Sequence, residues 1–444
     1  MAKKKMCCKC RRFYKSLDQH ICRSLNRRRI KRISGIKSYK NLDLNYLDVS
    51  HNWISEIDGL ANKTNLEELR ISDNKIKEIN GLEDLINLEV LFLDRNDINE
   101  IKGLENLLNL KKLDIRYNQI KTIKGLDNLG NLEVLNLEYN KITKIGGLEN
   151  LKNLKELNLA RNQITEIKGL DNLTNLQKLN LENNQITEIK GLENIPSLQQ
   201  LNLKNNQFTV LKGPEKQITI IELDLENNQI TEILELDNFK NLKKLKLDKN
   251  QISELKGLDN LKDLVSLYLK NNQISELKGL NKLKNLKELN LEGNKLSELK
   301  GLDNLENLRY LILYRNQITQ IKGLGNLNKL EYLNIDWNPI IWVEGLTSDN
   351  PQSPKKYDVK KIVEYCHHPI KKRNYKPEEI GKCEQCYRLF PREKFSKIYC
   401  RNCTRLDRLA PSVDVCPDCY EKNDYYCYKC EDHFDSLYRT YTKL

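Results

Sequence analysis

The feature that most constrains this chain is one line of sequence that recurs along it. The segment LQKLNLENNQITEIKGLENIPS fills residues 176–197, and near copies stand on both sides of it. The shared pattern is L-x-x-L-x-L-x-x-N-x-I-x-x-I-x-G-L-x-x-L-x-N, and its first asparagine recurs at one constant interval, from Asn52 and Asn74 through to Asn338. Such a fixed period predicts a solenoid, because a single unit cannot bury its apolar face without stacked neighbours.

The two halves of the repeat predict two walls around one core. The L-x-x-L-x-L half alternates, so we expect a short strand with inward leucines, and a parallel sheet built from the strands of successive repeats. The I-x-x-I-x-G half predicts a tight turn and a short helical piece, and its glycine suits a positive φ or a close backbone approach. The recurring asparagine lies in the apolar pattern, so its amide must be hydrogen-bonded, and we expect a ladder of such bonds to the adjoining turns.

These repeats resemble the 22-residue class of leucine-rich repeats, typified by a regulatory subunit of type-1 protein phosphatase and by bacterial internalins. The resemblance covers about residues 30–346. It implies an α/β fold, namely a leucine-rich-repeat solenoid with a parallel concave sheet and short 3₁₀ segments on the convex side. It also implies a binding protein rather than an enzyme, with no small-molecule substrate, and it does not identify the partner.

The rest of the chain divides around this array. We expect a basic, cysteine-containing arm at 1–29, a solenoid of about 14 full repeats at 30–346, a cap and linker at 347–382, a zinc-binding module at 383–430 and a tail at 431–444. The net charge is +14 over residues 1–40, +5 over 347–444 and −6 in between. Gly213 to Lys216 break the pattern and Glu235 replaces its glycine, which indicates either a local bulge or ordinary drift of the repeat.

A partner is expected on the sheet, where the variable positions of L-x-x-L-x-L-x-x are displayed. Arginine, tyrosine and tryptophan dominate the energetics of protein interfaces. Single exposed aromatic residues carry no meaning, but here they fall on successive strands, which favours contact with an unidentified protein. Two groups stand out: Phe92, Arg95, Tyr117, Tyr139 and Arg161, and then Tyr310, Tyr314, Arg315, Tyr332 and Trp337.

Cysteines gather near the C-terminal end in four C-x-x-C pairs. Two thiolates at this spacing supply two ligands of a tetrahedral Zn²⁺, and a second pair completes the four-coordinate site. Eight cysteines therefore predict two closed structural zinc sites. Closed sites stabilise a small module and leave no open position for catalysis. The pairing is sequential or interleaved as a cross-brace, and the wide spacing between the second and third pairs favours the sequential form. The ligands would be Cys383, Cys386, Cys400, Cys403, Cys416, Cys419, Cys427 and Cys430.

The N-terminal arm carries a further candidate metal set and a cluster of basic residues. Cys7, Cys10, His20 and Cys22 have a spacing that would close a third zinc site. The Lys and Arg clusters of the arm suit nucleic-acid association, and they equally suit a solvated arm or a localisation signal.

Three classes of function follow from the sequence. The first is a protein-interaction scaffold. The second is nucleic-acid association through the arm, and the third is a substrate-recruiting ubiquitin ligase with a RING-like C-terminus, which requires the cross-brace. No apolar run approaches a membrane span and the start lacks a secretory signal, so we expect an intracellular protein, in the cytoplasm or nucleus, without membrane attachment.

Overall fold

The structure is a computed structural model, and it describes residues 29–35 and 44–340 in full. Beyond these it describes Val363, which is buried, and the backbone of short strands in the arm and the tail. Two compact units make up the chain. The first comprises residues up to Ile230 together with Leu234–Leu245, and the second comprises Thr231–Ile233 and the residues from Lys246 onward.

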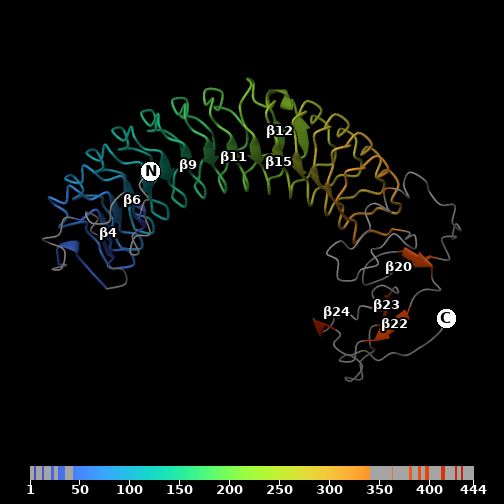
Figure 1. The fold of residues 1–444 in the computed structure, drawn as a ribbon, viewed down its shortest axis with the longest axis horizontal. Coiled ribbons are helices and arrows are strands. Elements are labelled where there is room, and N and C mark those ends of the chain that lie inside the picture. The colour runs from blue at the N-terminus through green and yellow to red at the C-terminus, as the bar shows by residue number, and fades with distance from the viewer. Residues whose placement is uncertain are drawn as a thin grey trace. The chain divides into compact units, whose positions relative to one another are not determined.

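In the first unit, each repeat contributes a strand of three residues to a parallel sheet. Neighbouring strands pair in register one repeat apart, so that equivalent leucines lie side by side, as Leu91 with Leu113 and Leu135 with Leu157. Figure 1 shows these strands next to one another, from β4 through β6 and β9 to β11, with the connecting loops on the other side. The strands are β4 (Tyr46–Asp48), β5 (Glu68–Arg70), β6 (Val90–Phe92), β7 (Lys112–Asp114), β8 (Val134–Asn136), β9 (Glu156–Asn158), β10 (Lys178–Asn180), β11 (Gln200–Asn202) and β13 (Glu222–Asp224).

The second unit repeats this construction. Leu289 pairs with Leu311, and Leu311 with Leu333, again one repeat apart in a parallel sheet. Its strands are β16 (Ser266–Tyr268), β17 (Glu288–Asn290), β18 (Tyr310–Ile312) and β19 (Tyr332–Asn334), while β15 (Lys244–Lys246) lies where the two units divide.

Short strands also occur in the arm and in the tail, where only their backbone is described. In the arm, β1 (Lys5–Met6) pairs antiparallel with β2 (Phe13–Tyr14), and β3 (Cys22–Ser24) adds a parallel strand beside β4. The antiparallel pairs of the tail are β20 (Ile380–Lys382) with β21 (Leu389–Pro391), β22 (Ser396–Tyr399) with β23 (Ser412–Val415), and β24 (Tyr426–Cys427) with β25 (Asp432–His433).

The patterned leucines and isoleucines form the core, as the sequence predicts. In the repeat that contains β8, Leu132, Leu135 and Leu137 are fully buried. Across the turn half, Leu129 N donates to Leu126 O at 3.0 Å and Leu132 N to Leu129 O at 2.9 Å. These are two single turns rather than a 3₁₀ helix, because their i→i+3 hydrogen bonds start three residues apart instead of at consecutive residues.

Helical structure is therefore scarce in the described part of the chain. Two 3₁₀ helices occur there, η1 (Ile33–Gly35) and η3 (Leu236–Asn238). The short 3₁₀ segments expected opposite the sheet are otherwise replaced by paired turns. The described solenoid is thus a parallel-sheet solenoid with almost no helix, rather than a mixed α/β structure.

The predicted asparagine ladder is present. The Nδ2 group of Asn184 donates to Leu181 O in its own repeat and to Leu159 O in the preceding repeat, both at 3.0 Å. Its Oδ1 accepts the backbone N–H of Ile164 at 3.0 Å. One buried amide thus satisfies backbone groups of two successive turns and joins them. Equivalent bonds occur at other repeats, as at Asn96 and Asn294.

A second asparagine of the repeat makes a ladder that the sequence did not reveal. This is the last asparagine of the pattern, and it lies on the exposed edge of the turn half. Asn109 Nδ2 donates to Ile86 O, and Asn131 Nδ2 to Leu108 O, each at 2.9 Å. Its position in the pattern was visible, but its acceptor became apparent only from the fold.

At Gly103 the repeat glycine has both a positive φ and a close backbone approach, the two properties for which the sequence suggested glycine. Its φ is +76°, and an added Cβ would lie 2.1 Å from Ile79 O. Glu235, which replaces this glycine, also takes a positive φ of 52°. Gly213, the equivalent glycine of the preceding repeat, is outside this positive-φ conformation.

A short strand comes immediately before the irregular segment Gly213–Lys216. It is β12 (Val210–Lys212), near β14 (Glu232–Leu234), and Gly213 N donates to Leu234 O at 3.1 Å. Lys212 Nζ lies 3.3 Å from Glu235 Oε2. The break in the pattern is therefore a local rearrangement rather than simple drift.

Candidate protein-binding surface

One residue of every repeat lies in the left-handed backbone region, immediately before the ladder asparagine. This residue follows the strand and turns the chain from the sheet toward the buried amide. Asparagine and glycine adopt this conformation most readily, whereas other residues enter it at a cost. The positions are His51, Asp73, Arg95, Tyr117, Tyr139, Arg161, Asn183, Asn205, Asn227, Lys249, Asn271, Gly293, Arg315 and Trp337, with φ between 53° and 68°.

Four of the predicted contact residues of the first unit occupy this column. With Phe92 they form what we call the first surface: Phe92, Arg95, Tyr117, Tyr139 and Arg161. The guanidinium carbon of Arg95 lies 4.3 Å from the ring centroid of Tyr117. The rings of Tyr117 and Tyr139 are stacked at 4.6 Å with 21° between their planes. Half of Tyr139 remains exposed, so the stack ends on an accessible ring.

Phe92 lies on the outward face of β6, the face turned away from the leucine core. The Arg70 guanidinium carbon lies 4.6 Å from its ring centroid, and Lys112 Nζ lies 5.2 Å from it. Arg70 Nε also donates to Glu68 Oε1 at 2.6 Å. Arg70 and Lys112 therefore belong to this surface, although they were absent from the predicted set. Their places on the strands of the preceding and following repeats were the signal that could have indicated them.

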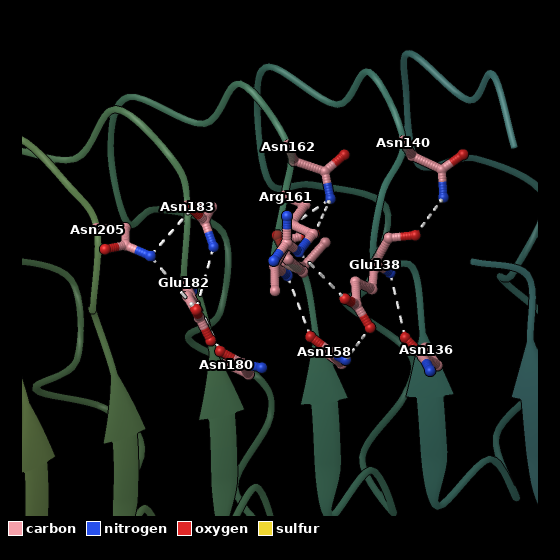
Figure 2. A network of polar contacts seen from close by, with 12 residues as sticks. Asn136, Glu138, Asn140, Asn158, Arg161, Asn162, Asn180, Glu182, Asn183 and Asn205 are labelled. Atoms are coloured by element: carbon pink, nitrogen blue, oxygen red, sulfur yellow. Dashed lines mark hydrogen bonds and ion pairs between the residues drawn. The ribbon is translucent and has the colours of Figure 1, made fainter. Parts of the chain in front are cut away.

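Arg161 does not continue the ring stack. Figure 2 shows it turned toward Glu138, whose Oε1 lies 3.6 Å from Arg161 Nε. The other carboxylate oxygen of Glu138 accepts a hydrogen bond from Asn158 Nδ2 at 3.4 Å. Among the described residues, no further ring or cation stacks on Tyr139. The first surface thus combines an open aromatic end with a fixed ion pair beside it.

The predicted residues of the second unit also come together, on β18, β19 and the turns that follow them. We call Tyr310, Tyr314, Arg315, Tyr332 and Trp337 the second surface. The ring centroids of Tyr310 and Tyr332 lie 6.4 Å apart, and those of Tyr314 and Trp337 lie 5.9 Å apart. Tyr310 is 43% and Trp337 39% exposed. Tilted aromatic pairs at such distances are favourable, and they keep large rings available at the surface.

Several ionisable groups on the outward face have displaced pKa values, and Asp114 and Tyr268 are two of them. Burial raises the pKa of the Asp114 carboxyl on β7, although the nearby Arg116 opposes this shift. Burial also raises the pKa of Tyr268 on β16 to about 12, and its hydrogen bond of 2.5 Å to Glu288 adds to the shift. Ser266 Oγ donates to the same Glu288 Oε2 at 3.1 Å, so that Tyr268 and Ser266 share one carboxylate acceptor.

The predicted zinc ligands lie outside the residues whose side chains are described. This applies to the eight cysteines of the tail and to Cys7, Cys10, His20 and Cys22 of the arm. Within residues 29–35 and 44–340, no group of three or more His, Cys, Asp or Glu side chains could hold a metal ion. Over the same part of the chain, no helix is long and apolar enough to cross a membrane.

Comparison with known proteins identifies the family. The sequence matches the leucine-rich repeats family (two copies) over residues 43–84, 64–108, 86–128, 130–172, 174–213 and 262–304. The solved structure of a leucine-rich-repeat protein of Leptospira interrogans is similar, with 30% identity and a TM-score of 0.59, over 73% of this chain and 83% of that one. This chain therefore belongs to the leucine-rich-repeat family.

Other solved structures are similar over shorter stretches. An internalin of Listeria monocytogenes is 31% identical over 61% of this chain and 87% of that chain, with a TM-score of 0.47. A chain of the LRIM1/APL1C complex is 25% identical over 61% of this chain and 53% of its own, with a TM-score of 0.52. A search of curated proteins found no match. Proteins of this family generally mediate protein–protein interactions.

Proposed function

We propose that this protein is an interaction scaffold that binds another protein on the outward face of its sheet. The first and second surfaces are the contact regions in this proposal. Each unit supplies a parallel sheet, and proteins of the family generally mediate protein–protein contact. The solenoid has no catalytic role in this proposal.

The observation that carries the proposal is the choice of residues in the left-handed column. At Asn183, Asn205, Asn227, Asn271 and Gly293 the chain uses the residue types that this conformation favours. At the two surfaces it uses Tyr, Trp and Arg in the same conformation. Left-handed backbone costs a residue with a Cβ about 1–2 kcal/mol. Such strain is found at functional sites, and these side chains are the types that dominate protein interfaces.

Affinity capture with the full-length chain tests this proposal. We would compare the wild type with Tyr139→Asn/Trp337→Asn, because asparagine keeps the left-handed backbone and removes the rings. Asn271→Gly is the matched control, since it changes the same column outside both surfaces. Captured proteins would be quantified by mass spectrometry.

The expected result is a loss of one or more captured proteins, by about tenfold or more, in the double variant alone. An interface residue of hot-spot quality contributes about 2 kcal/mol or more, which corresponds to a factor of about thirty in affinity. Equal capture by all three proteins would contradict the assignment of these surfaces. Equal loss in the Asn271→Gly control would show that the column matters only for folding.

We further propose that the C-terminal cysteines hold two structural Zn²⁺ ions, and that the protein is intracellular, where thiols stay reduced. The strand pairs β20–β21 and β24–β25 support the metal proposal. Cys383 and Cys386 fall in the connection of the first pair, and Cys427 and Cys430 belong to the second pair or its connection. A C-x-x-C pair between antiparallel strands suits one half of a tetrahedral site.

Metal analysis of the full chain distinguishes the two pairings. With sequential sites, Cys383→Ser/Cys400→Ser damages one site and removes about one Zn²⁺ per chain. With a cross-brace, the same two changes fall in different sites and remove about two. A wild-type protein purified without zinc would contradict the proposal altogether. A stoichiometry above two would point to the additional set in the arm.

A further inference from the structure

The cations on the outward face of β5–β11 fall into two groups. Most of them have a carboxylate partner, as Lys111 with Glu89 at 2.7 Å and Lys155 with Glu133 at 2.9 Å. Arg95 and Lys112 are the exceptions, because among the described residues no carboxylate lies within ion-pair distance of either. The paired cations of this face are Arg70, Lys111, Arg116, Lys155, Arg161, Lys178 and Lys204.

The two exceptions share a second property. Arg95 lies over the ring of Tyr117 at 4.3 Å, and Lys112 lies over the ring of Phe92 at 5.2 Å. An aromatic face holds a cation in place without neutralising its charge. Both cations are therefore oriented before any partner arrives, so little side-chain entropy is lost when an anion binds them.

The acidic side chains of the same stretch are already engaged. Glu89, Asp114, Glu133, Glu138 and Glu156 each face one of the paired cations. Asp94 has no cation partner among the described residues, but it is buried and accepts a hydrogen bond from the Ser72 hydroxyl. Farther along the face, Glu182 has no cation partner among the described residues and accepts hydrogen bonds from Asn183, Asn202 and Asn205, while Asp73 lies 2.6 Å from His51. Beside Phe92 and Tyr117, the accessible charges without an ion-pair partner in the described part of the chain are thus those of Arg95 and Lys112.

We propose that the first surface binds an acidic, aromatic-containing segment of a partner protein. Carboxylates of that segment pair with Arg95 and Lys112, and an aromatic side chain extends the stack on the exposed ring of Tyr139. Charge complementarity of this kind sets specificity and the rate of association. The proposal rests on the proposed function, since it names the chemistry of the partner for one of the two surfaces.

The probe is a fluorescently labelled copolymer of glutamate and tyrosine. A labelled copolymer of lysine and tyrosine, which has the opposite charge, is the control probe. Binding to the full-length chain would be measured by fluorescence anisotropy at several salt concentrations. The test variant is Arg95→Glu/Lys112→Glu. The control, Lys111→Glu/Lys155→Glu, makes the same change in net charge on the same sheet, but at cations that already have partners. Binding of the probe to the basic arm is therefore equal in both variants.

The test variant should bind the acidic copolymer about tenfold more weakly than the control, and the difference should shrink as salt rises. Tyr139→Asn should weaken binding of the same probe. Equal binding by the two charge variants, or preference of the wild type for the lysine–tyrosine copolymer, would overturn the proposal. Either result leaves the proposed function intact if affinity capture still depends on Tyr139 and Trp337, so the two ideas fail separately.

Discussion

Tyr139→Asn should leave the solenoid as stable as the wild type. The ring stacks on Tyr117 at 4.6 Å, and an aromatic pair of this kind contributes about 0.5–1.5 kcal/mol beyond its buried area. The substitution also relieves backbone strain, because Tyr139 has a φ of +58° and left-handed backbone costs such a residue about 1–2 kcal/mol. Asparagine tolerates this conformation, so the two contributions nearly cancel and the net change stays within about 1 kcal/mol of zero.

Hydrogen exchange measured by mass spectrometry suits this test, because stacked repeats open locally rather than all at once. The protection of the substituted repeat would be compared with the wild type in three variants, around β8 for Tyr139→Asn and Leu135→Ala and around β10 for Asn183→Tyr. Leu135→Ala removes a fully buried side chain and should lower the local stability by about 2–5 kcal/mol. Asn183→Tyr places a ring in the same column where asparagine is native and should cost about 1 kcal/mol.

The outcome that would refute this reasoning is specific. If Tyr139→Asn lowered protection as strongly as Leu135→Ala, the ring would belong to the packing of the solenoid rather than to a displayed surface. If Asn183→Tyr left the protection unchanged, the left-handed column would carry no strain. The residue types in that column would then give no evidence for a functional site.

Three further predictions concern the scaffold. Asn184→Ala should lower stability by about 1–3 kcal/mol, because it leaves the buried N–H of Ile164 unpaired and removes one of the two amide donors to Leu159 O and to Leu181 O. Urea unfolding would show this as a lower midpoint. Gly103→Ala should lower stability by about 1–3 kcal/mol or more, because the residue has a φ of +76° and an added Cβ would clash with Ile79 O. Gly130→Ala is the control, since nothing lies within 4 Å of an added Cβ there, and it should be neutral or slightly stabilising when both variants are compared by thermal unfolding. Asp114→Asn should stabilise the protein at pH 7. The raised pKa of Asp114 means that its charge is unfavourable in the fold, so the wild type loses stability as pH rises from the ordinary aspartate pKa of about 3.9, and the advantage of the variant should vanish below that pH. An advantage at pH 4 equal to that at pH 7 would show that this linkage is wrong.

The sequence was sufficient for the parts of the fold that depend on spacing. The constant period of the repeat placed Tyr117 beside Tyr139 and predicted the amide ladder, because both follow from register alone. The geometry of the turn half could not be predicted from the sequence. Paired turns and 3₁₀ helices bury the same leucines, and the choice between them depends on backbone hydrogen bonds that the apolar pattern does not encode.

Side-chain choices within the surface were also beyond the sequence. Arg161 follows Tyr139 at the same spacing as Tyr139 follows Tyr117, yet it turns to Glu138. A carboxylate within reach competes with a ring for the same guanidinium, and the spacing of residues does not decide that competition. For the same reason the pattern did not separate Arg95 and Lys112 from the paired cations around them.

Site-specific photo-crosslinking tests most directly whether the outward sheet face holds a partner. A photoreactive phenylalanine analogue would replace Tyr139 in one protein and Leu108 in another, since these side chains are 50% and 54% exposed but lie on the sheet side and in the turn half, respectively. Crosslinked proteins would be identified by mass spectrometry after irradiation with the full-length chain in a cell extract. We predict that position 139 yields a defined crosslinked protein that position 108 does not. A protein crosslinked at 108 and absent at 139 would place the interface on the other side of the solenoid.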